Sequence, residues 1–346
     1  MNLYVLASNR PAARFYRGGA RIADFRGEAP YGPDEPEDWV GSVTTVAGEQ
    51  SVGRTVLPGG SSLAEAIASD PRAWLGDEHV TAFGADPMLL VKLLDAGQRL
   101  PVHAHPGRAW ALEHLGAAHG KTEAWYILTP GTVHLGLTES IPRDEIERIV
   151  RVQDTTTLLS AMHRIDVRPG DTVHVPAGVL HAIGAGILLV ELQEPEDLSI
   201  LLEWRGFAID GSAAGHLGVG FDTALGAVET RAMSIDEVEH LIHRQEDSSR
   251  LLPDEAAPYF RLERTAVDGP AQLARGYAII VVLEGEVTLT ALDEMPEKLR
   301  SGSTVLVPYG AGEVRVEGAG ALLVCRPPLP GSSGRSASRT TVAGRR

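Results

Sequence analysis

The sequence predicts a mainly β protein, folded as sandwiches or barrels of short strands, and three observations support this prediction. Runs rich in β-branched and aromatic residues recur along the chain, and turn-forming residues bound each of them. Glycine and proline are plentiful, at 38 and 22 residues, and provide those turns. The runs follow one another closely, which is typical of antiparallel sheets and not of strands alternating with long helices. The clearest predicted strands are TEAWYIL, DTVHVPAG, GILLVEL, YAIIVVLEGEVTL, STVLVPYG and ALLVCRP.

Helices are predicted to interrupt the strands at three places. Ser62 and Glu65 form a capping box, in which a serine and a glutamate three residues later satisfy the first free amides of a helix. Ser234 and Glu237 make a second capping box. Pro142 suits the first turn of a third helix, because that turn needs no amide hydrogen. Apolar residues recur at helical spacing behind each start, so we expect these helices to pack on the core.

The composition favours a soluble protein that acts on small molecules. The chain has 346 residues, of which 43% are hydrophobic, and this length predicts about two domains. A net charge of −15 disfavours nucleic acid and anionic membrane surfaces as partners, and the apolar runs are too short to span a bilayer. The single cysteine, Cys325, excludes an intrachain disulfide. The first residues turn polar too soon for a secretion signal, so we expect a cytoplasmic location, and the oligomeric state stays open.

The chain divides into three predicted parts. Residues 1–250 carry the histidines described below, and we expect them to form a metal-binding catalytic domain with helical insertions. Residues 251–330 again have the pattern of an all-β segment but contain no histidine, which predicts a second, metal-free β-domain. Residues 331–346 are rich in Gly, Ser and Arg and have little to bury, so we expect a disordered tail there.

The segment RLPVHAHPGRAW, residues 99–110, carries the first chemical signal. Alternate residues of a strand point the same way, so His103 and His105 project together. Taken alone, this pattern leaves open whether the pair binds a metal or lies exposed to solvent. Glu123 begins an apolar run, where a carboxylate is costly to bury without a partner, and His181 follows a Pro-Ala-Gly turn. Three imidazoles and one carboxylate are a suitable ligand set for zinc or another divalent ion.

These residues fit the spacing of two motifs, and by them the chain resembles the cupin superfamily. The first motif is Gly, five residues, His-x-His and a later Glu, which is matched by Gly97, His103, His105 and Glu123. The second is Gly-Asp, four residues, Pro-x-Gly, two residues and His, which is matched by Gly170, Asp171, Pro176, Gly178 and His181. The resemblance implies two cupin (jelly-roll) β-domains with helical insertions. The unusual gap before the glutamate, PGRAWALEHLGAAHGK, is expected to form an inserted helix and turn.

The insertion and its surroundings resemble class I mannose-6-phosphate isomerases, a family of zinc-containing two-cupin sugar-phosphate isomerases. The matching stretches are LLVKLLDAGQRLPVHAHP, EHLGAAHGKTEAWYIL and VPAGVLHAIG, with EDWVGS as a weaker match. By this resemblance His105, Glu123 and His181 bind one Zn²⁺ per chain, or another divalent metal. His103 stands where the family usually has a glutamine ligand, and a histidine keeps a neutral donor there. We interpret His119, which lies in the insertion, as a surface residue.

The resemblance also implies catalytic residues. Lys121 corresponds to a lysine that lines the family's active site, and Glu191 aligns with a glutamate of the same pocket. The sequence leaves open which of the two moves the proton. The family has an active-site arginine shortly after that glutamate, but here Ile200 or Leu201 stands in its place. Arg205 shares the strand parity of Leu201, so it either replaces the lost arginine in the pocket or lies at the surface.

We therefore expect a metal-dependent aldose–ketose isomerase that interconverts mannose 6-phosphate and fructose 6-phosphate through an enediolate. Loss of the arginine leaves open the same reaction on another sugar, with or without a phosphate. Two other classes stay open, a dioxygenase with iron or nickel and a non-catalytic sugar-binding protein that keeps the metal. The helical insertion and GKTEAWYIL count against the dioxygenase, and Lys121 with Glu191 counts against the non-catalytic protein.

Overall fold

The computed structural model describes residues 1–244, 251–292 and 294–332 of the chain. The tail expected at 331–346 therefore lies almost entirely outside the described residues, as does the end of the segment 1–250, and both divisions stay predictions. Within the described residues, no helix combines the length and the apolar character that crossing a membrane requires.

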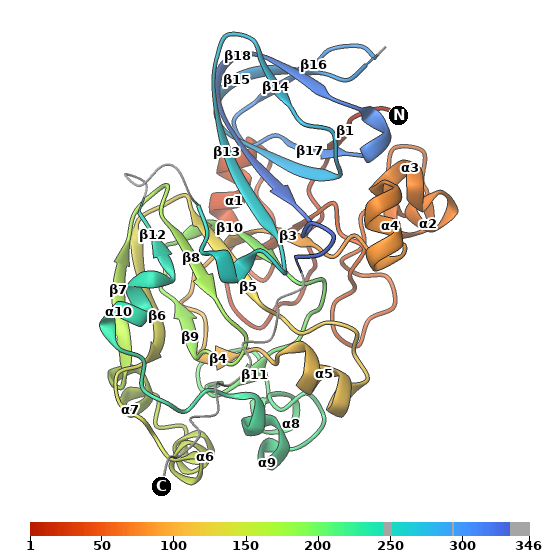
Figure 1. The fold of residues 1–346 in the computed structure, drawn as a ribbon. Helices are drawn as coiled ribbons and strands as arrows, with labels where there is room; N and C mark the ends of the chain where they lie inside the picture. Colours follow the sequence, from red (N-terminus) through yellow and green to blue (C-terminus); the bar gives the residue numbers. More distant parts are fainter. Residues whose placement is uncertain (245–250, 293, 333–346) are drawn as a thin grey trace, which may run out of the picture.

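Two antiparallel sheets form a sandwich between residues 37 and 243 (Figure 1). Side chains of both sheets share one core, whose buried cluster includes Trp125 of one sheet and Leu135 and Ile183 of the other. In the described residues, the six-stranded sheet has the order β12 (Ile242–His243), β8 (Thr172–Val175), β5 (Glu123–Ile127), β10 (Leu188–Gln193), β3 (Leu90–Asp95) and β2 (Glu37–Val40). The five-stranded sheet has the order β11 (Ile200–Leu201), β4 (His103–Ala104), β9 (His181–Ile183), β6 (Gly131–Leu137) and β7 (Met162–Val167).

A third antiparallel sheet is built mainly from the last part of the chain. Its order in the described residues is β1 (Tyr4–Leu6), β17 (Thr304–Val307), β15 (Ala278–Thr290), β18 (Val314–Arg326) and β13 (Arg261–Asp268). Two further strands extend it, β14 (Ala271–Leu273) beside β18 and β16 (Glu297–Arg300) beside β15. The N-terminal strand β1 lies at the edge of this sheet, with Tyr4 opposite Leu306. The two ends of the described chain are therefore joined in one sheet.

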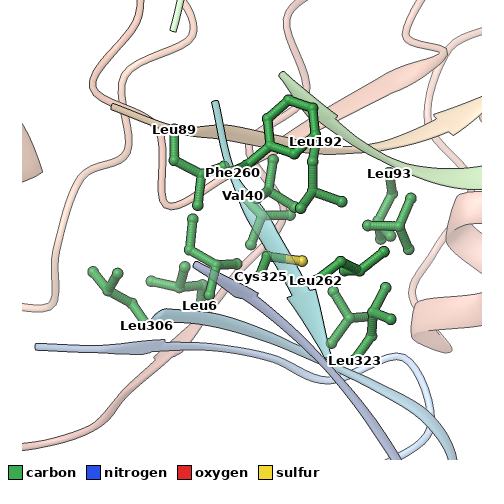
Figure 2. Close-up of a cluster of buried hydrophobic side chains, with 14 of the residues drawn as sticks. Leu6, Val40, Leu89, Leu93, Leu192, Phe260, Leu262, Leu306, Leu323 and Cys325 are labelled. Carbon is green, nitrogen blue, oxygen red and sulfur yellow. The ribbon is translucent and has the colours of Figure 1, made fainter. Parts of the chain in front are cut away.

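The sandwich and the third sheet share a hydrophobic core (Figure 2). Val40, Leu93 and Leu192 come from the six-stranded sheet and pack in one cluster with Leu262 and Leu323 of the third sheet. Leu93 and Leu323 are both 0% exposed. Complete burial of one such leucine stabilises a fold by about 1.5–3 kcal/mol, so the shared cluster holds the two units firmly together.

The structure confirms the predicted mainly β fold. The six strands expected from the sequence are present as β5, β8, β10, β15, β17 and β18. Every residue of β3 and β10 is buried. These strands lie between the sandwich core and the core shared with the third sheet, which explains why they appear in the sequence as nearly continuous apolar runs.

The predicted helices are also confirmed. Helices α2 (Leu63–Ser69) and α10 (Ile235–His240) begin at the two capping boxes, and α5 (Arg108–Leu115) fills the insertion. Helix α6 (Arg143–Val152) begins directly after Pro142, which caps the helix and does not lie in its first turn. The sequence analysis did not anticipate α1 (Ala20–Arg26), α3 (Pro71–Leu75), α4 (Asp77–Phe83), α7 (Thr155–Ser160), α8 (Gly211–Ala214), α9 (Phe221–Ala224) or the short 3₁₀ helices Leu225–Ala227, Asp254–Ala256 and Tyr309–Ala311.

Candidate metal centre

Three histidines converge inside the sandwich. His103 lies on β4 directly opposite His181 on β9, and His105 follows β4. One ring nitrogen from each of the three lies within 4.8 Å of the others, and all three side chains are buried. The turn before His181 is fixed by Gly178, whose φ of +89° favours glycine and whose amide donates to the carbonyl oxygen of His105 at 2.7 Å.

The backbone fixes which nitrogen of each histidine faces the centre of the cluster. Each Nδ1 lies at hydrogen-bond distance from a carbonyl oxygen, which only accepts: His103 to Pro101 at 2.8 Å, His105 to Leu198 at 2.6 Å and His181 to Val179 at 2.9 Å. In the neutral ring, a protonated Nδ1 leaves Nε2 with a free lone pair. Burial lowers the pKa of His103 well below its usual value and that of His105 to about 3, so these two rings are neutral. Such rings are suitable metal ligands.

Glu123, the first residue of β5, lies against this cluster. Its Oε2 is 3.0 Å from Nε2 of His105, and its Oε1 is 3.3 Å from Nε2 of His181, a buried atom without a hydrogen-bond partner. Trp125 donates to Oε1 at 3.0 Å and orients the carboxylate. Burial would raise the pKa of Glu123, but Lys121 and His105 lower it well below its usual value. An ionised carboxylate close to two of the three imidazoles, with an unpartnered nitrogen beside it, fits a divalent metal ion.

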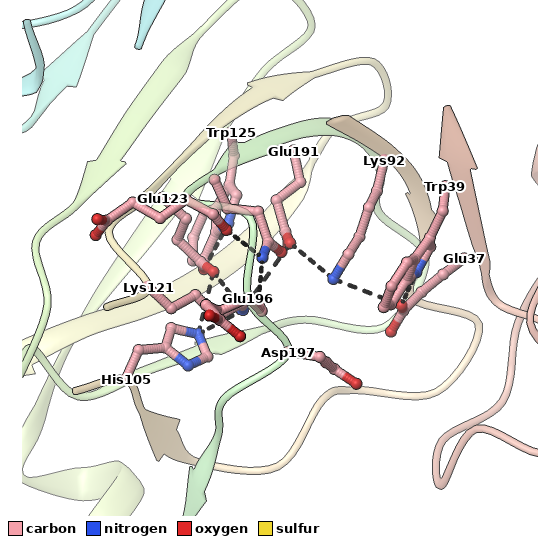
Figure 3. A network of polar contacts seen from close by, with 12 residues as sticks. Glu37, Trp39, Lys92, His105, Lys121, Glu123, Trp125, Glu191, Glu196 and Asp197 are labelled. Carbon is pink, nitrogen blue, oxygen red and sulfur yellow. Dashed lines mark hydrogen bonds and ion pairs between the residues drawn. The ribbon is translucent and has the colours of Figure 1, made fainter. Parts of the chain in front are cut away.

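Lys121 and Glu191 adjoin the ligand cluster, as the sequence predicts (Figure 3). The ammonium Nζ of Lys121 is 2.7 Å from Oε2 of Glu123, 2.8 Å from Nε2 of His105 and 4.0 Å from Oε1 of Glu191. Glu191 projects from β10 and is 3% exposed. Burial raises the pKa of Glu191, the negative charge of Glu123 raises it further, and Lys92 and Lys121 only partly offset these effects.

A line of alternating charges continues from Glu191 away from the histidines (Figure 3). Lys92 on β3 lies 3.3 Å from Glu191 and 3.6 Å from Glu37 on β2. Glu37 also accepts hydrogen bonds from Tyr16 at 2.6 Å and from Trp39 at 2.7 Å. Each carboxylate in the line therefore has a cation beside it, and the attraction between the two charges offsets part of the free-energy cost of burying them.

Arg14 ends this line. Its Nε lies 3.2 Å from Glu37, and its two Nη atoms lie 3.2 and 3.3 Å from the carboxylate oxygens of Asp197. Arg14, Lys92, Lys121, Glu191 and His103 all line one cavity. Arg14 is the one guanidinium among the described residues that line it.

The structure does not bring Arg205 to this cavity. Arg205 is exposed, and its Nη2 donates to the carbonyl oxygen of Val152 at 3.1 Å. Strand β11 ends at Leu201. The alternation of side chains along a strand therefore does not continue to residue 205, and it does not direct Arg205 to the same face as Leu201. The amide of Arg205 instead bonds to the side chain of Gln153 in a turn. Of the two alternatives for Arg205, the structure favours a surface residue.

Two other buried histidines, His119 and His174, lie outside the cluster of three. His119 is 7% exposed and lies 2.6 Å from Asp86, so its interpretation as a surface residue is wrong. His174 lies on β8 and is buried, with its ring centroid 6.3 Å from that of Phe260. It does not belong to the group of three clustered histidines.

The sequence analysis missed four residues of the cavity. Lys92 had a usable signal, because a lysine inside the apolar run LLVKLLD is costly to bury without a partner. Glu37 lies in EDWVGS, which had been noted only as a weak match. Arg14 and Asp197 had no comparable signal, because they lie in irregular segments that meet only in the fold.

Known proteins resemble both the sequence and the fold. The family described as mannose-6-phosphate isomerase, cupin domain, matches residues 254–327. Mannose-6-phosphate isomerase ManA of Bacillus subtilis is 30% identical over 322 residues, which cover 87% of this chain and 92% of that protein. A mannose-6-phosphate isomerase of Streptococcus mutans is 38% identical over 126 residues, covering 35% of this chain and 39% of that protein.

Solved structures share the architecture. The crystal structure of mannose 6-phosphate isomerase from Bacillus subtilis has a TM-score of 0.70 at 21% identity and covers 94% of this chain and 100% of that one. A mutant of phosphomannose isomerase from Salmonella typhimurium has a TM-score of 0.72 at 15% identity and covers 95% and 100%. At these identities the likeness shows the fold, and it supports two cupin units with helical insertions.

Proposed function

Because this chain belongs to the mannose-6-phosphate isomerase family, we propose that it interconverts mannose 6-phosphate and fructose 6-phosphate in the cavity beside the three histidines. The observation that carries the proposal is the convergence of three buried histidines with Glu123, Lys121 and Glu191, beside a cavity that His103, Glu123, Lys121 and Glu191 line. Neither a structural core nor a simple sugar-binding surface requires this set of charged groups, since each costs free energy to bury.

Membership of the family implies a metal cofactor, and we propose Zn²⁺ held by His103, His105, His181 and Glu123. The neutral imidazoles and the ionised carboxylate described above support this ligand set. When bound there, the metal ion would act as a Lewis acid for the carbonyl and hydroxyl oxygens of the sugar. Trp125 and the three backbone carbonyl acceptors hold the ligands in orientation.

Isomerisation moves a proton between C1 and C2 of the sugar, and we propose Glu191 as the group that carries it. A base must be able to gain and lose a proton near neutral pH, and burial raises the pKa of Glu191 in that direction. The ammonium of Lys121 has three N–H donors and no acceptor, and it donates one of them to Oε2 of Glu123. We assign it to a substrate oxygen on which negative charge develops.

Arg14 is the proposed contact for the far end of the substrate. A guanidinium has five N–H donors, and Glu37 and Asp197 take three from Arg14. Two N–H donors stay available for phosphate or hydroxyl oxygens at the end of the cavity opposite the histidines. This assignment replaces Arg205 as the basic residue of the site.

Proton NMR of the zinc-loaded protein in D₂O tests the proposal. Mannose 6-phosphate, fructose 6-phosphate, mannose and fructose are supplied separately, and interconversion and deuterium exchange at C1 and C2 are followed. We expect interconversion of the phosphorylated pair. Turnover of the free sugars alone would show that the substrate is an unphosphorylated sugar. Binding of the sugars without exchange would overturn the enzymatic assignment.

A further inference from the structure

An ion pair outside the cavity, formed by buried Glu194 and half-buried Arg108, is not used by the proposed reaction. Glu194 follows β10 and is 1% exposed. Its Oε2 accepts a hydrogen bond from the amide of Thr122 at 2.9 Å, and its own amide donates to the carbonyl oxygen of Thr122 at 3.1 Å. Thr122 lies between Lys121 and Glu123 in the sequence. Glu194 therefore bonds to both the amide and the carbonyl group of the residue that connects Lys121 to Glu123.

Arg108 neutralises this carboxylate from the first residue of α5. Its Nε donates to Oε1 of Glu194. The guanidinium also lies over the ring of Tyr259, 4.5 Å from the ring centroid, and its Nη2 donates to the carbonyl oxygen of Pro258 at 3.3 Å. Residues 258–259 closely precede β13, the first strand of the segment 251–330, which contains no histidine and is called the histidine-free unit below. One guanidinium therefore joins that unit to the segment before β5.

The backbone at Gly120 and Lys121 is closely packed against the backbone at Pro106 and Arg108. The amide of Lys121 donates to the carbonyl oxygen of Pro106 at 3.0 Å. A Cβ atom added to Gly120 would lie 2.6 Å from that same oxygen and 2.7 Å from the amide nitrogen of Arg108. Displacement of Arg108 would therefore be transmitted to Lys121 and Glu123, because close-packed segments have no room to absorb it.

We propose that Arg108 and Glu194 are a positioning pair, through which residues 258–259 of the histidine-free unit hold Lys121 and Glu123 in the geometry required for metal binding and proton transfer. The inference rests on the proposed function. It gives the second unit a part in catalysis, although none of its residues lines the catalytic cavity among those described. Arg108 and Glu194 do not line that cavity either, so the pair acts through Thr122.

The test compares Arg108→Ala, Arg108→Lys and Tyr259→Leu with the wild-type chain. Arg151→Ala is the matched control, because it removes an arginine whose ion pair with Glu147 is at the surface. For Arg108→Ala we expect kcat and zinc affinity each to fall about 10–100-fold, the range for loss of a group that orients a metal ligand, with a smaller change in KM. Arg108→Lys keeps the charge beside Glu194 and should recover part of the loss, and Tyr259→Leu should reduce kcat in the same direction.

Two measurements keep the test independent of turnover. Zinc affinity is measured by competition with a chelator, and protection of the Thr122 amide is measured by hydrogen exchange in the metal-free protein. Weaker zinc binding and faster exchange in Arg108→Ala would support the pair even in a chain that turned over none of the sugars. Unchanged kcat, zinc affinity and Thr122 protection in Arg108→Ala would overturn the proposal, whatever the effect on melting temperature. If Arg108→Ala does not fold, Arg108→Lys and Tyr259→Leu decide by the same criteria.

Discussion

Two buried glutamates of the cavity are shifted in opposite directions by their neighbours. Burial raises the pKa of each, but Lys121 and His105 dominate at Glu123 and lower its pKa well below the usual value. At Glu191 the negative charge of Glu123 adds to the effect of burial, and its pKa stays raised. The opposite shifts keep Glu123, a proposed metal ligand, ionised, and they suit Glu191 for the proposed exchange of a proton.

Substitution of Glu191 tests this separation at the residue scale. Glu191→Gln keeps the shape of the side chain but removes the carboxylate, so kcat should fall by about 10²–10⁴-fold, the usual contribution of a general base. Zinc content should stay at the wild-type value, because Glu191 is not among the proposed ligands. Glu113→Gln, at a side chain that is 76% exposed, is the control. Wild-type kcat in Glu191→Gln would remove Glu191 from the mechanism.

The metal ligands give a second prediction at this scale. His181→Ala removes the buried Nε2 that lacks a hydrogen-bond partner, and zinc binding should weaken by more than about 100-fold, since changes to groups that only orient ligands already cost up to that much. Activity should disappear with the metal. His114→Ala, on the insertion helix and outside the cluster, should leave both unchanged. Metal analysis of the purified variants checks this, and full zinc content in His181→Ala would contradict the ligand assignment.

At the scale of elements, the turn between β8 and β9 positions His181, one of the proposed metal ligands. Gly178 has φ of +89°, and a Cβ atom there would lie 3.1 Å from the carbonyl oxygen of Ala227. Gly178→Ala should therefore lower the free energy of unfolding by about 1–3 kcal/mol, the cost of a strained backbone position, and weaken zinc binding by displacing His181. Urea unfolding and chelator competition measure the two effects.

Gly226→Ala, in the short 3₁₀ helix Leu225–Ala227, is the control for Gly178→Ala. Its φ is not in the left-handed region and a Cβ atom would make only ordinary contacts, 3.7 Å or more from its neighbours. Stability and zinc affinity should therefore match the wild type. Equal behaviour of the two glycine variants would show that the conformation of the turn does not position His181.

How much the sequence could predict also differs between elements. Strands β5, β8 and β10 were predictable because their apolar runs are bounded by turn-forming residues, and the His-x-His spacing placed His103 and His105 together. The parity argument for Arg205 failed because β11 is only two residues long, too short for alternation to extend beyond it. Arg14 could not be found at all, since its partner Asp197 is distant in sequence and no local pattern links them.

At the scale of the whole molecule, the line of buried charges makes stability depend on pH. Burial would raise the pKa of Glu37, but Arg14 and Lys92 lower it to about 2, below the value of about 4.3 for an unfolded chain. Between these values the unfolded chain binds more protons, so the free energy of unfolding decreases as the pH falls. The pKa of Asp197 is lowered by Arg14 against the effect of burial, and its contribution has the same sign.

Urea unfolding at a series of pH values tests this dependence. The wild-type midpoint should begin to decrease as the pH falls below about 6.5, where the unfolded histidines gain protons that buried His103 and His105 do not, and should decrease further between about pH 4.3 and about pH 2. Glu37→Gln should have a lower midpoint near neutral pH and a shallower decrease on acidification, because one depressed carboxyl group has been removed. A midpoint that rose on acidification across this range would contradict the assigned charges.

The shared core and the proposed Arg108–Glu194 pair join the two units of the molecule around the three-histidine cluster, which is the proposed metal centre. The most direct test of that centre is reconstitution: metal-free protein receives Zn²⁺ in increments, and the initial rate of fructose 6-phosphate formation is measured after each addition. Our account predicts no turnover without metal and a linear rise that stops at one Zn²⁺ per chain. Full turnover in the metal-free protein would contradict it.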